Sequence, residues 1–185
     1  ERQDRLAVAS HARAGASKLA GRQTSEIVPV TTRVTVIDRA TKEVTGKKTV
    51  TVSEDEGIRL GVTIGHLAKL PTVFKKDGST TPGNASQLSD GAAAVILMKR
   101  AEAMERGLVP MATLRSFAVA GVDPAVMGIG PVIAIPRALE KAGLTINDID
   151  LFEINEAFGS QADYCIEKLG LNRDVVNVMG GAIAI

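Results

Sequence analysis

At 185 residues the chain can hold one or two domains, and 45% of its residues are apolar, which suffices for a sizeable core. The net charge is +1, and no basic run is interleaved with aromatic residues, which excludes a nucleic-acid-binding groove. No apolar run reaches the roughly 18 residues that a membrane-spanning helix needs. Cys165 is the single cysteine, which excludes an internal disulfide.

The first ninety residues predict a helix, a hairpin and long loops. Apolar residues recur at helical spacing over 1–21 and predict an amphipathic helix. Apolar and polar residues alternate over 26–37 and again over 48–53, which predicts an antiparallel hairpin. One or two helical turns precede Pro71, and residues 75–89 form a long loop of small and polar residues.

From residue 90 the pattern changes to short apolar runs separated by helical segments. Such an order is typical of an α/β fold with a layered sheet. The expected elements are strand 92–98, helix 100–106, strand 112–122, helix 131–142, strand 149–154, helix 157–169 and strand 175–178.

The cysteine and the two histidines show no catalytic or metal-binding pattern. Cys165 falls in mid-helix, away from the helix N-terminus that would activate a thiol, so a buried structural role is favoured over a nucleophilic one. His11 is expected on the exposed side of the first helix, and His66 near a short irregular helix. Neither has a cysteine or carboxylate at ligand spacing, so no metal is expected.

The 75–89 loop is a candidate binding segment. Lys75 and Lys76 could attract phosphates, and Asn84 and Ser86 could hydrogen-bond amide groups of an extended ligand. The alternative is a solvated loop without a ligand, and the residues alone leave both interpretations open.

Asn155 and Glu156 are the strongest local signal, because they lie between a predicted buried strand and a predicted helix. Ligands of α/β sheets bind at such strand ends. A carboxamide there can orient a water molecule or complete an oxyanion hole. Alternatively, Asn155 simply caps the helix over 157–169.

Motifs in order along the whole chain resemble the thiolase family, specifically its 3-ketoacyl-CoA thiolases of the peroxisomal type. Together these motifs are highly specific, and they cover both predicted site segments. They are Glu26–Val30, Asp55–Arg59, Phe74–Thr81, Gly83–Ala94, Val126–Pro131, Asn155–Phe158 and Asn177–Ile185.

The resemblance implies an α/β thiolase fold, five-layered α-β-α-β-α and built from two similar halves, of which this chain would hold a part. Residues 1–88 would belong to the loop domain that covers CoA. Residues 89–109 would end the N-terminal half, and residues 112–185 would begin the C-terminal half. The resemblance also implies a homodimer or homotetramer.

The activity that the resemblance implies is thiolytic cleavage of 3-ketoacyl-CoA by free CoA, in fatty-acid β-oxidation. CoA and acyl-CoA would be substrates, with no separate cofactor and no metal, and the expected compartment is the peroxisome, or alternatively mitochondria or cytoplasm. Two other functions stay open: a biosynthetic acetyl-CoA acetyltransferase, and a short non-catalytic protein that binds acyl-CoA.

Site residues are carried over from the same resemblance. Asn155 would hold the catalytic water beside the thioester carbonyl, and Glu156 would support it. The residues expected to contact substrate are Arg59 at the nucleotide end of CoA, Ser86 at the pantetheine arm, and Phe74, Met127, Ala157 and Phe158 as pocket walls.

Three catalytic groups of the family have no counterpart in the sequence. The nucleophilic cysteine would lie before Glu1, a Gly-His-Pro motif would follow Ile185, and a second cysteine would lie further on. Cys165 matches neither cysteine. We therefore expect an internal fragment that is inactive alone, because loss of such groups leaves only binding and oxyanion contributions.

Overall fold

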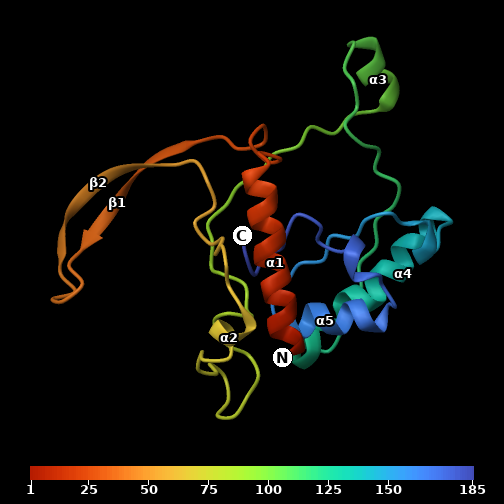
Figure 1. Ribbon diagram of the computed structural model, residues 1–185. Coiled ribbons are helices and arrows are strands. Elements are labelled where there is room, and N and C mark those ends of the chain that lie inside the picture. The colour runs from red at the N-terminus through yellow and green to blue at the C-terminus, as the bar shows by residue number, and fades with distance from the viewer.

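Helix α1 (Arg2–Leu19) is the central element of the structure, a computed structural model that describes residues 1–185. In Figure 1 the hairpin lies on one side of α1, and helices α4 (Gly130–Ala142) and α5 (Gly159–Lys168) lie on the other. The end of the chain returns to the side of α1. The predicted first helix is confirmed, and its contacts with α5 make it the element on which the site is built.

The predicted hairpin is confirmed as strands β1 (Val30–Ile37) and β2 (Val44–Val52). They pair antiparallel, with Val30 opposite Val52. The connecting turn is closed by the Asp38 carboxylate, which accepts two backbone N–H groups at 2.8 Å. The hairpin projects away from the rest of the molecule, so it does not contribute to the core (Figure 1).

All of the predicted helical segments form. Helix α4 ends at Gly143, which has a φ of 70° and so takes the left-handed conformation that glycine tolerates. Short α2 (Ile64–Leu67) is capped by the Thr63 hydroxyl, which accepts the N–H of His66. The other helical elements are α3 (Arg100–Glu105), the kinked 3₁₀ segment η1 (Pro124–Ile129), and the single 3₁₀ turns η2 (Ile146–Asp148) and η3 (Arg173–Val175).

Two predicted strands are wrong. Residues 92–98 and 112–122 have no regular secondary structure, and no backbone-to-backbone hydrogen bond involves them. A β-strand is stabilised by a ladder to a neighbouring strand, and the sheet of this chain contains only β1 and β2. Two side-chain hydrogen bonds hold the second segment against α4 instead: Lys141 of α4 donates to the carbonyl of Phe117 at 3.0 Å, and Ser116 of the segment donates to the α4 carbonyl of Ala138 at 2.7 Å.

The predicted strands over 149–154 and 175–178 are reduced to a single parallel bridge. Phe152 and Val176 pair, with the N–H of Phe152 bonded to the carbonyl of Val175 at 2.8 Å. This bridge brings the two segments side by side over a short distance. This short pairing still fixes the position of the backbone that leads into Asn155.

The core is small and lies where α1, α5 and this bridge meet. Only 24 of 185 residues are buried, so the site depends on a few apolar contacts. Each fully buried large aliphatic or aromatic side chain contributes roughly 1.5–3 kcal/mol. No helix of the chain combines the length and apolar character needed to cross a membrane. The main apolar cluster consists of Phe152, Ile154, Ile166, Leu171 and Val176.

Candidate functional site

Asn155 emerges from the core at the end of the bridged segment. Ile154 and Glu156 are buried, with 5% and 3% of their surfaces exposed, whereas Asn155 between them is exposed. This alternation is what an extended backbone produces, since successive side chains point to opposite faces. The carboxamide of Asn155 makes no hydrogen bond within the chain, so its donors and acceptor are free for a ligand or water.

The alternative role of Asn155 as a helix cap is wrong. Helix α5 begins at Gly159, its N-cap residue is Phe158, and no side chain caps it. A capping side chain accepts a backbone N–H two or three residues further on. Asn155 lies too far before the helix for that bond.

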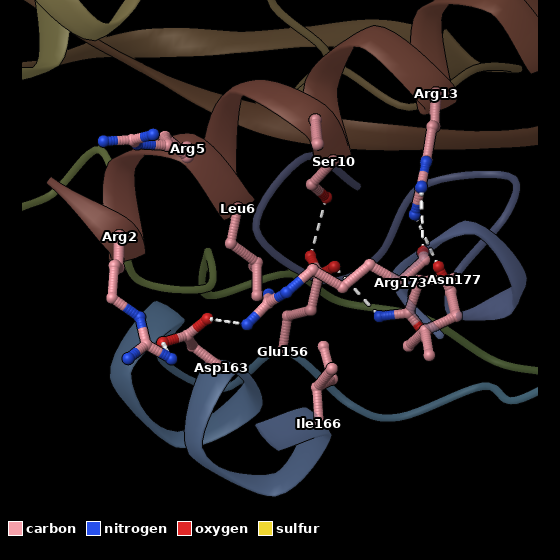
Figure 2. Close-up of a pocket in the computed structure, with 12 residues that line it drawn as sticks. Arg2, Arg5, Leu6, Ser10, Arg13, Glu156, Asp163, Ile166, Arg173 and Asn177 are labelled. Carbon is pink, nitrogen blue, oxygen red and sulfur yellow. Dashed lines mark hydrogen bonds and ion pairs between the residues drawn. The ribbon is translucent and has the colours of Figure 1, made fainter. Parts of the chain in front are cut away.

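Glu156 is a buried carboxylate whose two oxygens are both used. One oxygen accepts from the Asn177 amide at 2.9 Å. The other accepts from the Ser10 hydroxyl at 2.6 Å and from the N–H of Ile183 at 3.3 Å. A buried charge is tolerated only when it is hydrogen-bonded in this way. Glu156 therefore joins α1 to the last turn of the chain, and Figure 2 shows Ser10 and Asn177 beside its carboxylate.

Four of the predicted substrate-contacting residues lie together. The N–H of Ser86 donates to the carbonyl of Ala157 at 3.0 Å, and Phe158 pairs with Ala85 in an antiparallel bridge. The Phe74 and Phe158 rings meet edge to face, with centroids 5.8 Å apart. The 75–89 loop is thus joined by backbone pairing to the segment that carries Asn155, and the Ser86 side chain stays exposed.

Asn84 does not have the role expected of it. It is 1% exposed, and its amide is fully used within the protein. Its oxygen accepts from the N–H of Thr81, and its nitrogen donates to Asp4 and to the carbonyl of Ser79, each at 3.0 Å. Asn84 therefore fixes the loop on α1 and has no group left for a ligand.

Arg59 contacts helix α1 at His11. The N–H of Arg59 donates to His11 Nδ1 at 3.2 Å, and the Arg59 residue itself is exposed. His11 is 4% exposed, so the prediction that it lies on the exposed side of the helix is wrong. The cause is that residues 57–60 cover that face of α1, as the contact of Leu60 with Gly15 shows. Burial, and then the nearby Arg59 charge, lower the pKa of His11, against an opposing effect of Glu156.

Met127 and Cys165 lie at the contact between η1 and α5. Met127 is on η1 and 71% exposed. Cys165 is fully buried, and its thiol donates to the carbonyl of Gly128 at 3.4 Å. Burial raises the pKa of this thiol, so it stays neutral and weakly nucleophilic at neutral pH. The favoured structural role of Cys165 is confirmed.

A cavity of about 370 Å³ lies beside the Glu156 network, between α1 and α5. Three of its arginines are held by an acidic side chain or by carbonyls: in Figure 2, Arg2 and Arg173 share Asp163, at 2.8 and 2.6 Å. Arg13 donates to the carbonyls of Val176 and Arg173 at 2.5 and 2.9 Å. No cluster of three or more His, Cys, Asp or Glu side chains in the chain could hold a metal ion.

Sequence reasoning missed Ser10 and Asn177 as site residues. Ser10 is a polar residue on the buried face of α1, and that mismatch was its only local signal. Asn177 has a φ of 48°, which asparagine tolerates better than most residues, and it precedes the Gly180–Gly181 pair. Nothing in the local sequence around either residue indicates that Glu156 is its partner. Ser10 lies 146 positions and Asn177 lies 21 positions from Glu156 in the sequence.

Comparison with known proteins identifies the protein family of this chain. Sequence models of the family match in chain order: "Thiolase, N-terminal domain" over residues 1–101 and "Thiolase, C-terminal domain" over residues 108–185. The fold is thus that of a thiolase-type α/β protein. The chain belongs to the thiolase family.

Individual relatives agree with this assignment. The chain is 57% identical to the peroxisomal 3-ketoacyl-CoA thiolase A of Mus musculus, over its whole length and 42% of the mouse protein. It superposes on the crystal structure of the Bacillus anthracis acetyl-CoA acetyltransferase with a TM-score of 0.87 and 42% identity, covering 99% of this chain and 44% of the other. For the dimeric peroxisomal thiolase of Saccharomyces cerevisiae the TM-score is 0.86 with 43% identity, over 98% and 43% of the two chains. The chain thus spans about two fifths of these relatives.

Proposed function

We propose that the whole protein is a 3-ketoacyl-CoA thiolase, which cleaves 3-ketoacyl-CoA with free CoA to acetyl-CoA and a shortened acyl-CoA. The observation that carries this proposal is the exposed, unbonded carboxamide of Asn155 directly beside the Ser86–Ala157 backbone pairing. Family membership and the mouse relative at 57% identity support the same assignment.

In this proposal the chain supplies an oxyanion site and part of the substrate pocket. The Asn155 carboxamide would hold a water molecule or donate directly to the thioester oxygen as negative charge develops on it. A fixed donor of this kind contributes about 10²–10³ in rate in other enzymes. Phe74, Ala157 and Phe158 would line the pocket, and Ser86 and Arg59 would contact the pantetheine and nucleotide parts of CoA. Met127 would add a further apolar wall.

Acyl transfer also needs a nucleophile, and Cys165 is unsuited to that role. Its thiol is fully buried and its pKa is raised by burial. The acylated cysteine, the activating histidine and the second, proton-transferring cysteine would therefore come from outside these 185 residues. We expect the chain alone to bind CoA without turnover.

A biosynthetic acetyl-CoA acetyltransferase is less well supported. The acetyltransferase of Bacillus anthracis is 42% identical, compared with 57% for the mouse 3-ketoacyl-CoA thiolase. The relatives' names also support a peroxisomal location and a dimeric assembly, as in the yeast enzyme. Both are proposals for the whole protein.

The test is an assay of the complete gene product with a medium-chain 3-ketoacyl-CoA and CoA. Thiolysis removes the absorbance of the Mg²⁺-enolate complex, and no loss of absorbance would contradict the proposal. Asn155→Ala should lower kcat about 10²–10³-fold. Asn147→Ala is the matched control, because Asn147 is an equally exposed asparagine on η2 without any site contact, and its kcat should stay unchanged.

A second measurement addresses binding by the chain alone. Titration calorimetry with CoA should give a saturable signal that Ser86→Tyr weakens, because a large side chain would block the exposed loop position. Desulfo-CoA should bind equally well if recognition is through the pantetheine and nucleotide. Binding that is insensitive to the Ser86 substitution would contradict the placement of CoA beside residues 84–86.

A further inference from the structure

The side chain of Asn177 makes the hydrogen bonds that the parallel backbone ladder lacks beside Asn155. The N–H of Phe152 donates to the carbonyl of Val175, and the N–H of Asn177 donates to the carbonyl of Phe152, both at 2.8 Å. The next backbone bonds of a parallel ladder would reach Ile154. They do not form, because the backbone turns away at Asn177, where φ is 48°.

The Asn177 side chain makes those bonds instead. Its oxygen accepts the N–H of Ile154, and its nitrogen donates to the carbonyl of Ile154, each at 2.8 Å. Both backbone groups of the residue before Asn155 are thereby held by one carboxamide. Asn177 itself is 4% exposed, so water does not compete for these bonds.

Glu156 fixes which way the Asn177 carboxamide points. The Asn177 nitrogen also donates to a Glu156 oxygen at 2.9 Å. A flipped amide would place its oxygen against the Ile154 carbonyl and the Glu156 carboxylate, and its NH₂ against an N–H donor. Such a flip leaves three buried groups without partners, which is strongly unfavourable. The orientation is therefore determined by Glu156 and by Ile154 together.

We infer that Asn177 is a positioning residue for Asn155: with Glu156 it pins the backbone on both sides of the exposed carboxamide. Catalytic donors act only when they are held in the productive geometry by supporting hydrogen bonds. The consequence for the reaction rests on the proposed function. The positioning itself rests on the contacts of Asn177 with Ile154 and Glu156.

Hydrogen exchange of single backbone amides tests the positioning without any activity. In Asn177→Gly the left-handed backbone is tolerated and only the carboxamide is lost. We expect exchange at the Ile154 amide to accelerate at least about tenfold, while the Phe152 amide, bonded to Val175, stays protected. The control Asn172→Gly removes an exposed cap of η3 and should leave Ile154 protected. Unchanged exchange at Ile154 in Asn177→Gly would overturn the inference.

A pH profile separates positioning from simple packing. Asn177→Asp keeps the size but sets a carboxylate against Glu156, and two adjacent carboxylates raise the pKa of the pair. The folded variant then binds more protons than the unfolded one above about pH 4, so its stability falls as pH rises through this window. Its stability deficit should therefore be larger at neutral pH than near pH 5. The double variant Asn177→Asp with Glu156→Gln restores an amide–carboxylate pair and should reduce that pH dependence, although burial and the Ile154 carbonyl still favour a protonated Asp side chain there. A deficit independent of pH would contradict the inference.

Kinetics of the complete gene product link this arrangement to catalysis. Asn177→Gly should lower kcat at least about tenfold with little change in KM, because binding of substrate does not need the donor geometry of Asn155. An active protein with unchanged kcat in this variant would overturn the inference. An inactive wild-type protein with fast Ile154 exchange in Asn177→Gly would instead contradict the proposed function and support the positioning.

Discussion

Gly181 lies directly against the carboxylate of Glu156. A Cβ atom at position 181 would lie 2.4 Å from Glu156 Cδ and 2.6 Å from its Oε2. The neighbouring Gly180 has a φ of 88°, and a Cβ atom there would lie 2.6 Å from Ala14 Cβ and 2.8 Å from the carbonyl oxygen of Ser10. The glycine pair therefore lets the last turn of the chain reach both α1 and the buried carboxylate.

Gly181→Ala should reduce the free energy of unfolding by about 1–3 kcal/mol, because the added methyl group displaces a hydrogen-bonded carboxylate that cannot move without losing partners. Urea unfolding followed by circular dichroism measures the change. Gly121→Ala is the control, since a Cβ there meets nothing within 4 Å, and its effect should stay within about 0.5 kcal/mol. Equal effects of the two substitutions would contradict the close approach.

Arg13→Lys should reduce the free energy of unfolding by about 1 kcal/mol. The Arg13 guanidinium bridges the carbonyls of Val176 and Arg173, and an ammonium group lacks the planar fork that reaches both. Thermal unfolding measures the loss. Arg5→Lys is the matched control on the same helix, because Arg5 pairs only with exposed Glu1 and should change stability by less than about 0.5 kcal/mol.

The stability of the chain should fall as pH drops below about 6.5, the ordinary pKa of histidine. Burial and the Arg59 charge lower the pKa of His11 in the folded state. Between the ordinary and the lowered pKa the unfolded state binds more protons, so acid favours unfolding, by at most about 1.4 kcal/mol per pH unit for one group. Protonation also removes the Nδ1 acceptor that Arg59 uses.

Urea unfolding from about pH 7.5 to pH 5.5 checks this dependence on His11. His11→Gln cannot titrate and should flatten the profile in that window. His66→Gln, at the other, exposed histidine, should leave the profile as in the wild type. A profile that is equally steep in all three proteins would assign the dependence to other groups.

The thiol of Cys165 should react with Ellman's reagent far more slowly in the folded chain than in urea, by at least about tenfold, because it is fully buried and neutral. The absorbance of the released thionitrobenzoate measures the rate. The urea-unfolded chain serves as the control for reagent and thiol content. Reaction at the rate of an exposed thiol would show that α5 and η1 separate readily.

Local patterns were enough to predict the helices and the hairpin. Periodicity reports which residues suit a helix or strand, and α1, α4, α5 and the β1–β2 pair follow it. The family resemblance was also evident from motifs alone, because each motif combines several residue types in a fixed order. The substrate contacts expected of Arg59, Phe74, Ser86, Met127, Ala157 and Phe158 remain predictions.

Tertiary structure alone decided the partners of these elements. The strands predicted over 92–98 and 112–122 do not form, because a ladder depends on a second strand that no local pattern supplies. His11 is buried because distant residues cover its side of α1. The carboxylate of Glu156 could be read from the sequence as a polar residue near the site, but its bonds to Ser10 and Asn177 could not. Hydrogen bonds between segments far apart in sequence depend on how the whole chain folds back, which local propensity does not contain.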